Sequence, residues 1–474
     1  MEFDQLLQGI RSGELQVTGI YHDSRKVQPG GVFVCKRGER VDGHLFIPQA
    51  KEAGAAYIVG ELDLPDDDYV LVPDGRAALA DLAYAFYGQR GQDLKLVGVT
   101  GTNGKSTTCH LVASLLNWGG LPAATIGTLG VFFPEDCQLE NTINTTPDAL
   151  EMARLLAKLQ AAGARAAAVE ISSIALEQDR ARGMDFAGVV FTNLTQDHLD
   201  YHGSFEKYFQ AKRRLFTLPH RWRVINIDDP YGARLANEFP GSLTVSAMQA
   251  ASIQAAQVTV KDAGFSFRLT MDGRQAQVDT PLPGMHNLYN LLSAFGSIKS
   301  VGLDPFDYLE AAPYLTLPKG RWEVIGHAPT VIVDYAHTPD GMEQVLQHAR
   351  RIAKGQVITV FGCTGNRDRG KRPLMGEIAS RYSEYVVLSN DNPEDEDPAA
   401  IAAETVIGIH KPHLVELDRE KAIAAAVNMA GPDDLVLILG KGHEEGMKIG
   451  RKLIPFSDAA VARRYWELRH GRAE

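Results

Sequence analysis

A glycine-rich segment with one lysine and several hydroxyl side chains, TGTNGKSTT at residues 100–108, carries the clearest chemistry of the sequence. It lies between an apolar run of strand composition (94–99) and a stretch of helical composition (105–117). Backbone N–H groups at such a turn bind phosphate, Lys105 can reach the outer phosphates, and the Ser106 hydroxyl can ligate Mg²⁺. The segment predicts a nucleotide-phosphate loop, although the first glycine of the usual GxxxxGK[ST] spacing is missing.

Two further polar residues follow predicted strands. Glu170 ends the apolar run 166–170, and His198 follows the run 188–192. If these strands neighbour the phosphate-loop strand in a parallel sheet, both side chains lie at the same sheet edge as Ser106. Taken alone, such a histidine is more often a packing or capping residue. Its place beside a phosphate loop makes it, with Glu170, a candidate Mg²⁺ ligand.

Three polar, turn-rich segments in the last third of the chain also follow short apolar runs. They are GCTGNRDRGKRP (362–373), SNDNPEDEDP (389–398) and GKGHEEG (440–446), after the runs 357–361, 385–388 and 435–439. Open α/β sheets bind ligands at the carboxyl ends of their strands. The three segments therefore predict a second ligand-binding edge.

The alternation of strand and helix patterns along the chain predicts an α/β fold of three domains. We expect a small N-terminal α/β domain (1–92), a central P-loop domain with a parallel sheet that binds ATP (93–317) and a C-terminal Rossmann-like, doubly wound domain (318–474). The polar and apolar alternation at 251–282 predicts antiparallel strands beside the central parallel sheet.

Composition excludes several classes of protein. The 474 residues are 45% hydrophobic and carry a net charge of −11, which excludes a disordered chain and makes nucleic acid an unlikely partner. No signal peptide or membrane span is visible, and the four cysteines have no CxxC spacing. We expect a cytoplasmic protein with free thiols, no membrane partner and, by default, a monomeric state.

Eleven motifs together resemble the Mur ligases, and among them the MurE type, which adds the third residue to UDP-N-acetylmuramoyl-L-alanyl-D-glutamate. In chain order they are TGTNGKSTT, NTTP, EISSIALEQDR, FTNLTQDHLDYHG, AKRRLF, GMHNLYN, KGRWE, VDYAHTPDGM, GNRDRGKRP, DNP and GKGHE. The resemblance implies a peptidoglycan-precursor ligase that uses ATP and Mg²⁺.

The resemblance also implies where ATP and Mg²⁺ bind. The ATP-binding residues would be Gly101, Thr102, Asn103, Gly104, Lys105, Ser106, Thr107, Asn287, Asn290, Arg321, Asp334 and His337. Mg²⁺ would be held by Ser106, Glu170, His198 and a Lys212 carbamylated by CO₂. A carbamate makes physical sense there, because an ammonium repels Mg²⁺ and an anionic oxygen binds it.

The UDP-muropeptide would be bound by residues of the first two domains. They are Ser24 for the nucleotide, and Asn144, Thr145, Thr146, Ser172, Gln178 and Arg180 for the muropeptide. One position departs from the family, which has Ser-Ser-His where this chain has Ser-Ser-Ile ending at Ile174. The function of that histidine is absent here or supplied elsewhere.

The incoming amino acid would be bound by the C-terminal loops through Arg367, Asp391, Asn392, Glu394, Gly440 and Glu444. Family members that add meso-diaminopimelate have arginine where this chain has Glu394. An acidic side chain disfavours a second carboxylate and favours an ammonium, so we expect L-lysine or L-ornithine. Residues 395–397 could instead be an acidic turn before a helix.

The predicted reaction is ATP-driven amide formation through an acyl phosphate on the D-glutamate side chain. Lys105, Glu170, His198 and Lys212 would act in catalysis, with two Mg²⁺ ions, and the domains would close about linkers near 92 and 318. The alternatives are a meso-diaminopimelate-adding ligase with a rebuilt carboxylate site and a folyl-polyglutamate ligase. Outside the ligases they are a P-loop ATPase and a non-catalytic nucleotide-binding regulator.

Overall fold

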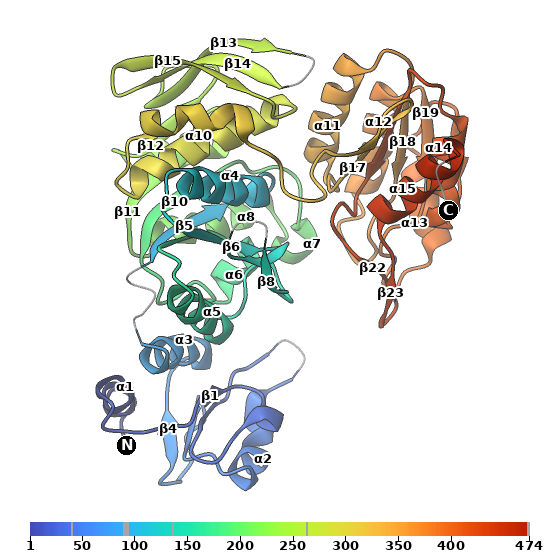
Figure 1. Ribbon diagram of the computed structural model, residues 1–474. Coiled ribbons are helices and arrows are strands. Elements are labelled where there is room, and N and C mark those ends of the chain that lie inside the picture. Colours follow the sequence, from blue (N-terminus) through green and yellow to red (C-terminus); the bar gives the residue numbers. More distant parts are fainter. Residues whose placement is uncertain (39–40, 89–93, 135–136, 262–263, 472–474) are drawn as a thin grey trace.

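Three sheets divide the chain into three lobes, as the computed structural model shows (Figure 1). The structure describes residues 1–38, 41–88, 94–134, 137–261 and 264–471. The predicted α/β class and three-domain organisation are confirmed. The predicted boundary near 92 lies outside the described residues.

The N-terminal sheet has four parallel strands in sequence order, β1 to β4 (Ile20–Tyr21, Val32–Val34, Tyr57–Gly60 and Tyr69–Leu71). Its helices are α1 (Phe3–Ser12), α2 (Ile47–Glu52) and α3 (Gly75–Phe86). Apolar side chains of α1 and α3 pack together on the strands and form the core of this lobe.

The central sheet has eleven strands in the order β15-β14-β13-β12-β11-β10-β5-β9-β6-β7-β8. Strands from β13 across to β6 run parallel, and the two ends of the sheet are antiparallel, as predicted for 251–282. The strands are β5 (Lys95–Thr100), β6 (Ala123–Gly127), β7 (Gly130–Phe132), β8 (Gln138–Glu140), β9 (Ala166–Glu170), β10 (Phe186–Phe191), β11 (His220–Asn226), β12 (Leu243–Ser246), β13 (Ile253–Val260), β14 (Phe265–Met271) and β15 (Arg274–Thr280).

Helices cover both faces of the central sheet and form one core on each face. One core lies under α4 (Lys105–Trp118) and α10 (Met285–Ser300). The other lies under α5 (Ala149–Ala161), α6 (Ser173–Glu177), α8 (Phe205–Arg213) and α9 (Pro230–Glu238), with the short α7 (Leu199–His202) nearby. Burial on both faces explains why the central strands read as continuous apolar runs.

The phosphate-loop strand β5 lies between β9 and β10, which meets the condition under which Glu170 and His198 were expected near Ser106. Val99 pairs with Glu170 on one side, and Thr100 pairs with Phe191 on the other. All three strands run parallel, so their carboxyl ends and the loops that follow meet at one edge.

The C-terminal sheet has the order β16-β17-β21-β18-β19-β20 and is parallel except for β16. The predicted strands at 357–361, 385–388 and 435–439 are confirmed. Its strands are β16 (Glu323–Gly326), β17 (Thr330–Asp334), β18 (Val357–Phe361), β19 (Tyr385–Leu388), β20 (His413–Val415) and β21 (Leu435–Leu439), followed by the hairpin β22 (Gly446–Ile449) and β23 (Lys452–Pro455). The helices are α11 (Pro339–Ile352), α12 (Lys371–Tyr382), α13 (Pro398–Val406), α14 (Arg419–Met429) and α15 (Asp458–Arg469).

Two peripheral hairpins, β7–β8 and β22–β23, escaped the sequence analysis. Both are built from strands of three or four residues, and β23 is exposed throughout. Such strands carry little of the apolar alternation by which a half-buried strand is recognised. Both hairpins nevertheless line a cavity next to the candidate active site.

Two predictions from composition were also tested. None of the helices formed by the described residues is long and apolar enough to span a membrane. The four cysteines are free thiols, as predicted, with Cys35, Cys109 and Cys363 buried and Cys137 exposed.

Candidate active site

A cavity of about 690 Å³ lies where the carboxyl edge of β5, β9 and β10 faces the C-terminal lobe. It unites most of the predicted ATP, metal and amino-acid residues. Those that line it are Thr102, Asn103, Gly104, Lys105, Ser106, Thr107, Thr145, Glu170, His198, Asn287, Asn290, Arg321, Asp334, His337, Arg367, Asp391, Asn392, Glu394, Gly440 and Glu444.

Eight predicted residues do not line this cavity. Gly101 lies at the base of the phosphate loop, and Lys212 lies behind it in contact with its carbonyl. The muropeptide residues Asn144, Thr146, Ser172, Gln178 and Arg180 and the nucleotide residue Ser24 also lie outside.

The phosphate loop turns sharply into α4 at Gly104, whose φ is +86°. A Cβ there would come within 2.4 Å of the Asn290 side-chain oxygen, so glycine is needed for both conformation and space. Lys105 donates hydrogen bonds to the carbonyls of Gly101 (3.0 Å) and Thr102 (2.9 Å) and forms no ion pair with any described residue. Burial lowers the pKa of Lys105. The loop therefore presents a half-buried cation without a counter-charge, which suits a phosphate.

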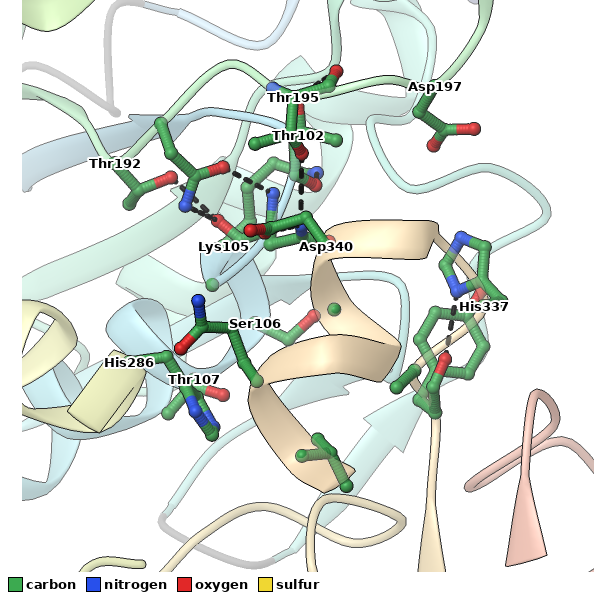
Figure 2. A pocket seen from close by; sticks show the side chains of 18 of the residues that line it. Thr102, Lys105, Ser106, Thr107, Thr192, Thr195, Asp197, His286, His337 and Asp340 are labelled. Carbon is green, nitrogen blue, oxygen red and sulfur yellow. Dashed lines mark hydrogen bonds between the residues drawn. The ribbon is translucent and has the colours of Figure 1, made fainter. Parts of the chain in front are cut away.

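Asn103 joins the phosphate loop to the C-terminal lobe. Its side-chain nitrogen donates a hydrogen bond to Asp340 (2.9 Å), and its side-chain oxygen accepts one from the Thr338 hydroxyl (3.2 Å). Both partners lie at the start of α11. Figure 2 shows Asp340 directly beside the phosphate-loop residues Thr102 and Lys105, with His337 farther to the right, below Asp197. The sequence analysis assigned Asn103 to ATP alone and missed this contact between lobes.

Ser106 and Glu170 lie on the same cavity wall, as predicted. Both Glu170 carboxylate oxygens accept hydrogen bonds from Thr128, one from its backbone N–H (2.9 Å) and one from its hydroxyl (3.1 Å). Among the described residues no three His, Cys, Asp or Glu side chains cluster to hold a metal. The donors fit a Mg²⁺ that takes a few protein oxygens and completes its shell with phosphate oxygens and water.

His198 adopts a left-handed backbone conformation (φ +52°) at the start of α7, and its ring lies 3.4 Å from the Asp197 carboxylate. Burial lowers the pKa of His198 to about 4, so the imidazole is neutral and able to bind a metal. Asp197 also lies 3.7 Å from the buried Lys371 of the C-terminal lobe. Although burial opposes its ionisation, His198 and Lys371 hold the pKa of Asp197 well below its usual range.

Lys212, on α8, is 1% exposed and donates a 2.7 Å hydrogen bond to the Gly101 carbonyl. Its ammonium lies over the Tyr208 ring, and it forms no ion pair with any described residue. Burial, together with Lys105, holds the pKa of Lys212 well below its ordinary value.

The cavity is also lined by α10 and by the loop after β11. Asn290 is within hydrogen-bond distance of Asn287 and Thr108. Tyr289 donates to Asp228 (3.0 Å), a cavity residue that the sequence analysis missed because it lies outside the quoted motifs.

Residues predicted to close over ATP lie at the entry to the C-terminal lobe. The Arg321 guanidinium stacks 4.2 Å from the Tyr335 ring and reaches the Ser106 hydroxyl (3.4 Å). Asp334 accepts hydrogen bonds from two backbone N–H groups, and burial raises its pKa. His337 lies at the same edge, near Tyr335. Residues from two lobes therefore meet at Ser106.

The amino-acid loops carry several charges that pair among themselves. Lys441 contacts Asp391 (3.5 Å) and Glu444 (2.7 Å). Glu394 pairs with Lys448 (3.2 Å) on the β22–β23 hairpin, and the two segments also share backbone hydrogen bonds. Arg367 differs, since it forms no ion pair or hydrogen bond with any described residue.

The acidic residues after Glu394 have structural partners. Glu396 pairs with the fully buried Arg372 and with Arg369, and Asp397 accepts the hydrogen bond that begins α13. These two carboxylates serve the turn and the helix, as the alternative interpretation of 395–397 stated.

The muropeptide residues form one hydrogen-bonded network beside the cavity. Thr146 contacts the backbone of Glu170 (2.8 Å) and Ser172 (3.0 Å), and Arg180 donates to the Thr146 carbonyl (2.8 Å) and to Gln178. Asn144 is exposed nearby.

Ser24, in contrast, lies in the N-terminal lobe and contacts Gln49 (2.6 Å). Ile174 follows Ser173, whose hydroxyl lies 2.9 Å from the buried His202 ring. An imidazole is thus present beside the segment that departs from the family.

Comparison with known protein families gives matches over most of the chain. The profile "Mur ligase family, catalytic domain" matches residues 16–87, "Mur ligase middle domain" matches 99–298, and "Mur ligase, glutamate ligase domain" matches 320–442.

Curated proteins and solved structures resemble the chain along nearly its whole length. UDP-N-acetylmuramoyl-L-alanyl-D-glutamate--2,6-diaminopimelate ligases of Synechococcus elongatus and Pseudomonas aeruginosa are 44% and 41% identical, covering 95% and 96% of this chain and 94% and 97% of theirs. A solved structure of the same name is 33% identical (TM-score 0.69, covering 96% and 95%). Thermotoga maritima MurF in complex with ADP is 19% identical (TM-score 0.64, covering 96% and 98%) and supports the fold alone.

Proposed function

Since the chain belongs to the Mur ligase family and is an ATP-dependent, MurE-type ligase that adds a diamino acid to UDP-N-acetylmuramoyl-L-alanyl-D-glutamate, we propose that this diamino acid is meso-diaminopimelate. Two kinds of support favour it. The relatives described above are named as 2,6-diaminopimelate ligases. The other support is local and lies in the C-terminal loops.

The ion pair of Glu394 with Lys448 is the observation that carries the proposal. A lone Glu394 would repel the second carboxylate of diaminopimelate. Paired with Lys448, it belongs to a dipole of no net charge. The far end of diaminopimelate is itself an ammonium and a carboxylate, so the pair can exchange partners with it, Glu394 taking the ammonium and Lys448 the carboxylate.

Arg367 supports the same assignment. It lines the cavity and has no partner among the described residues, so its guanidinium is available for a carboxylate. Arg367 lines the active-site cavity and Lys448 lines the adjoining one, so the loops offer a cation for each of two carboxylates. L-lysine or L-ornithine, expected from Glu394 as an isolated charge, would leave one of these cations without a substrate partner and remains the second candidate.

The cavity residues account for ATP-driven amide formation. The side-chain carboxylate of D-glutamate attacks the γ-phosphorus of ATP, ADP leaves, and an acyl phosphate forms. The incoming amine then attacks the carbonyl carbon and phosphate leaves. Lys105 and the loop N–H groups offset the charge on the transferring phosphate, while Arg321 closes the site from the C-terminal lobe. Mg²⁺ held by Ser106, Glu170 and His198 would neutralise phosphate oxygens.

Lys212 is proposed to be carbamylated. A lysine held at a lowered pKa is largely neutral, and the neutral amine attacks CO₂ to give a carbamate and a proton. In the place of the ammonium beside the Gly101 carbonyl, the carbamate would supply a negative charge and oxygen ligands for Mg²⁺. The lowered pKa and the absence of an ion pair to any described carboxylate support this assignment.

The test is ligation of three amino acids by the wild type and two lysine variants. Tripeptide product is measured with ATP, UDP-muropeptide and either meso-diaminopimelate, L-lysine or L-ornithine. We expect diaminopimelate to be preferred and Lys448→Met to raise its KM about tenfold, since a hydrogen bond to a charged group is lost. The KM of L-lysine should change little.

Lys452→Met is the matched control, because Lys452 lies on the same hairpin and makes no contact with Glu394. It removes the same charge and should leave the KM of diaminopimelate unchanged. A wild type that prefers L-lysine or L-ornithine, with a preference that Lys448→Met does not alter, would refute the diaminopimelate assignment.

A further inference from the structure

Thr128, in the turn between β6 and β7, contacts both a predicted metal ligand and a predicted muropeptide residue. Its backbone N–H and its hydroxyl bind the two oxygens of the Glu170 carboxylate. The same hydroxyl lies 3.0 Å from that of Thr145. Thr128 lies in none of the sequence motifs, and the resemblance gives it no function.

The proton count limits this chain. An ionised Glu170 only accepts hydrogen bonds, and the Thr128 hydroxyl has one proton, which can reach Glu170 (3.1 Å) or the Thr145 hydroxyl (3.0 Å). Thr128 therefore donates to Glu170 or to Thr145, but not to both at once. A ligand that donates to the Thr145 hydroxyl competes with Thr128 for it and directs the Thr128 proton to Glu170.

The local structure is built for this contact. Glu170 is 2% exposed, and a Cβ on the neighbouring Gly127 would come within 2.0 Å of its carboxylate. Glycine at that position lets the carboxylate reach Thr128. Two bonds from one residue fix the carboxylate plane, and each oxygen keeps a lone pair free for a cation.

The two cavities meet at these residues. Thr128 and Glu170 line both the active-site cavity and a second one of about 890 Å³ between the β7–β8 and β22–β23 hairpins. Thr145 lines the first. The chain Thr145–Thr128–Glu170 thus runs along the wall where muropeptide and metal would be neighbours.

We propose that Thr128 is a positioning residue that orients Glu170 for Mg²⁺ and that, through Thr145, ties this orientation to occupancy of the muropeptide site. The inference rests on the proposed function of Glu170 as a metal ligand. It assigns Thr128 a function that the motifs do not contain.

The experiment measures metal affinity rather than turnover. Mn²⁺ binding to the full-length protein with a non-hydrolysable ATP analogue is followed by electron paramagnetic resonance, with and without UDP-muropeptide. Thr128→Val keeps the side-chain size and the backbone bond and removes only the hydroxyl. We expect Mn²⁺ affinity to fall 10- to 100-fold, as for other residues that orient metal ligands.

Muropeptide should change Mn²⁺ affinity by about fivefold or more in the wild type and by less than twofold in Thr128→Val. Thr128→Ser retains the hydroxyl and should restore both values. Thr142→Val is the matched control, because the Thr142 hydroxyl binds the Gly127 carbonyl (2.7 Å) without touching Glu170. It should bind Mn²⁺ like the wild type.

The outcomes separate this inference from the function it rests on. A wild type that forms the tripeptide, with Thr128→Val binding Mn²⁺ equally well, would overturn the inference and leave the ligase assignment standing. Equal loss in Thr128→Val and Thr142→Val would also overturn it. A wild type that binds no Mn²⁺ with the nucleotide and forms no product would overturn both.

Discussion

The phosphate-loop region and the amino-acid loops treat charge in opposite ways. The half-buried Lys105 and the buried Lys212 donate hydrogen bonds only to carbonyl oxygens and form no ion pair with any described residue. Lys441 and Lys448 in the C-terminal loops are paired with carboxylates. In the first region Lys105 is left without a counter-charge, as a phosphate requires, and Lys212 is left as an unpaired amine, whereas the lysines of the second region already have carboxylate partners and suit a zwitterion. The same residue type thus serves two kinds of recognition.

Lys105→Met gives the largest effect expected from this comparison. It removes the cation that we propose binds the phosphates, so kcat for tripeptide formation should fall about 10²- to 10³-fold. Because no described carboxylate is left unpaired, the free energy of unfolding should stay equal or rise. Steady-state kinetics measure the expected fall in kcat, and urea unfolding measures the free energy of unfolding. A marked loss of stability would contradict the claim that this lysine lacks a counter-charge.

Lys441→Met should do the reverse. Lys441 and Asp391 are both buried, and removal of the lysine leaves that carboxylate and Glu444 unpaired. The free energy of unfolding of the C-terminal lobe should fall by about 3 kcal/mol. Hydrogen exchange measured for this lobe checks it. If Lys441→Met and Lys105→Met have the same free energy of unfolding, the contrast between paired lysines in the amino-acid loops and unpaired lysines near the phosphate loop is wrong.

The pH dependence of stability should reflect His198, at the junction of the two regions. Its pKa is lowered from 6.5 to about 4 by burial, so between these values the unfolded chain binds a proton that the folded chain does not. Stability is therefore lost as the pH falls from about 6.5 towards 4. The free energy of unfolding of His198→Gln minus that of the wild type should be about 1 kcal/mol higher at pH 5 than at pH 8. This value is reduced for the partial solvent exposure of His198. Urea titrations at the two pH values test this.

Asp340→Ala should give the smallest effect. It removes one hydrogen bond from Asn103 that links the two regions. The KM of the diamino acid should rise about fivefold or less, since the lost bond is worth about 1 kcal/mol, with the KM of ATP nearly unchanged. If both KM values rise equally, Asn103 acts on the nucleotide rather than on the contact between lobes.

The phosphate-loop side could be read from the sequence because its chemistry is local. Strand, glycine turn, lysine and helix are contiguous, and the structure places β9 and β10 beside β5, so the residues that follow all three strands lie at one sheet edge. Thr128 could not be found in this way. It touches Glu170 across 42 positions of sequence, and its surroundings carry no motif.

In the amino-acid loops, the sequence analysis treated Glu394 as an isolated negative charge that repels a second substrate carboxylate, because its partner Lys448 was not known. Lys448 lies on an exposed hairpin that has no clear strand pattern and is 54 positions away. The effect of a charge depends on the other charges within a few ångströms, because electrostatic energy falls with distance in space and not along the chain.

The sequence by itself determined the three α/β lobes, the strands that precede the site loops and the family of ligases to which the chain belongs, because hydrophobic periodicity and contiguous motifs are local properties. Only the tertiary structure decided which charges are paired and which are left for a substrate, that Asn103 links two lobes, and that Thr128 holds Glu170. These features depend on contacts between residues that are far apart in the sequence and that packing brings together, so no single segment of the chain reveals them.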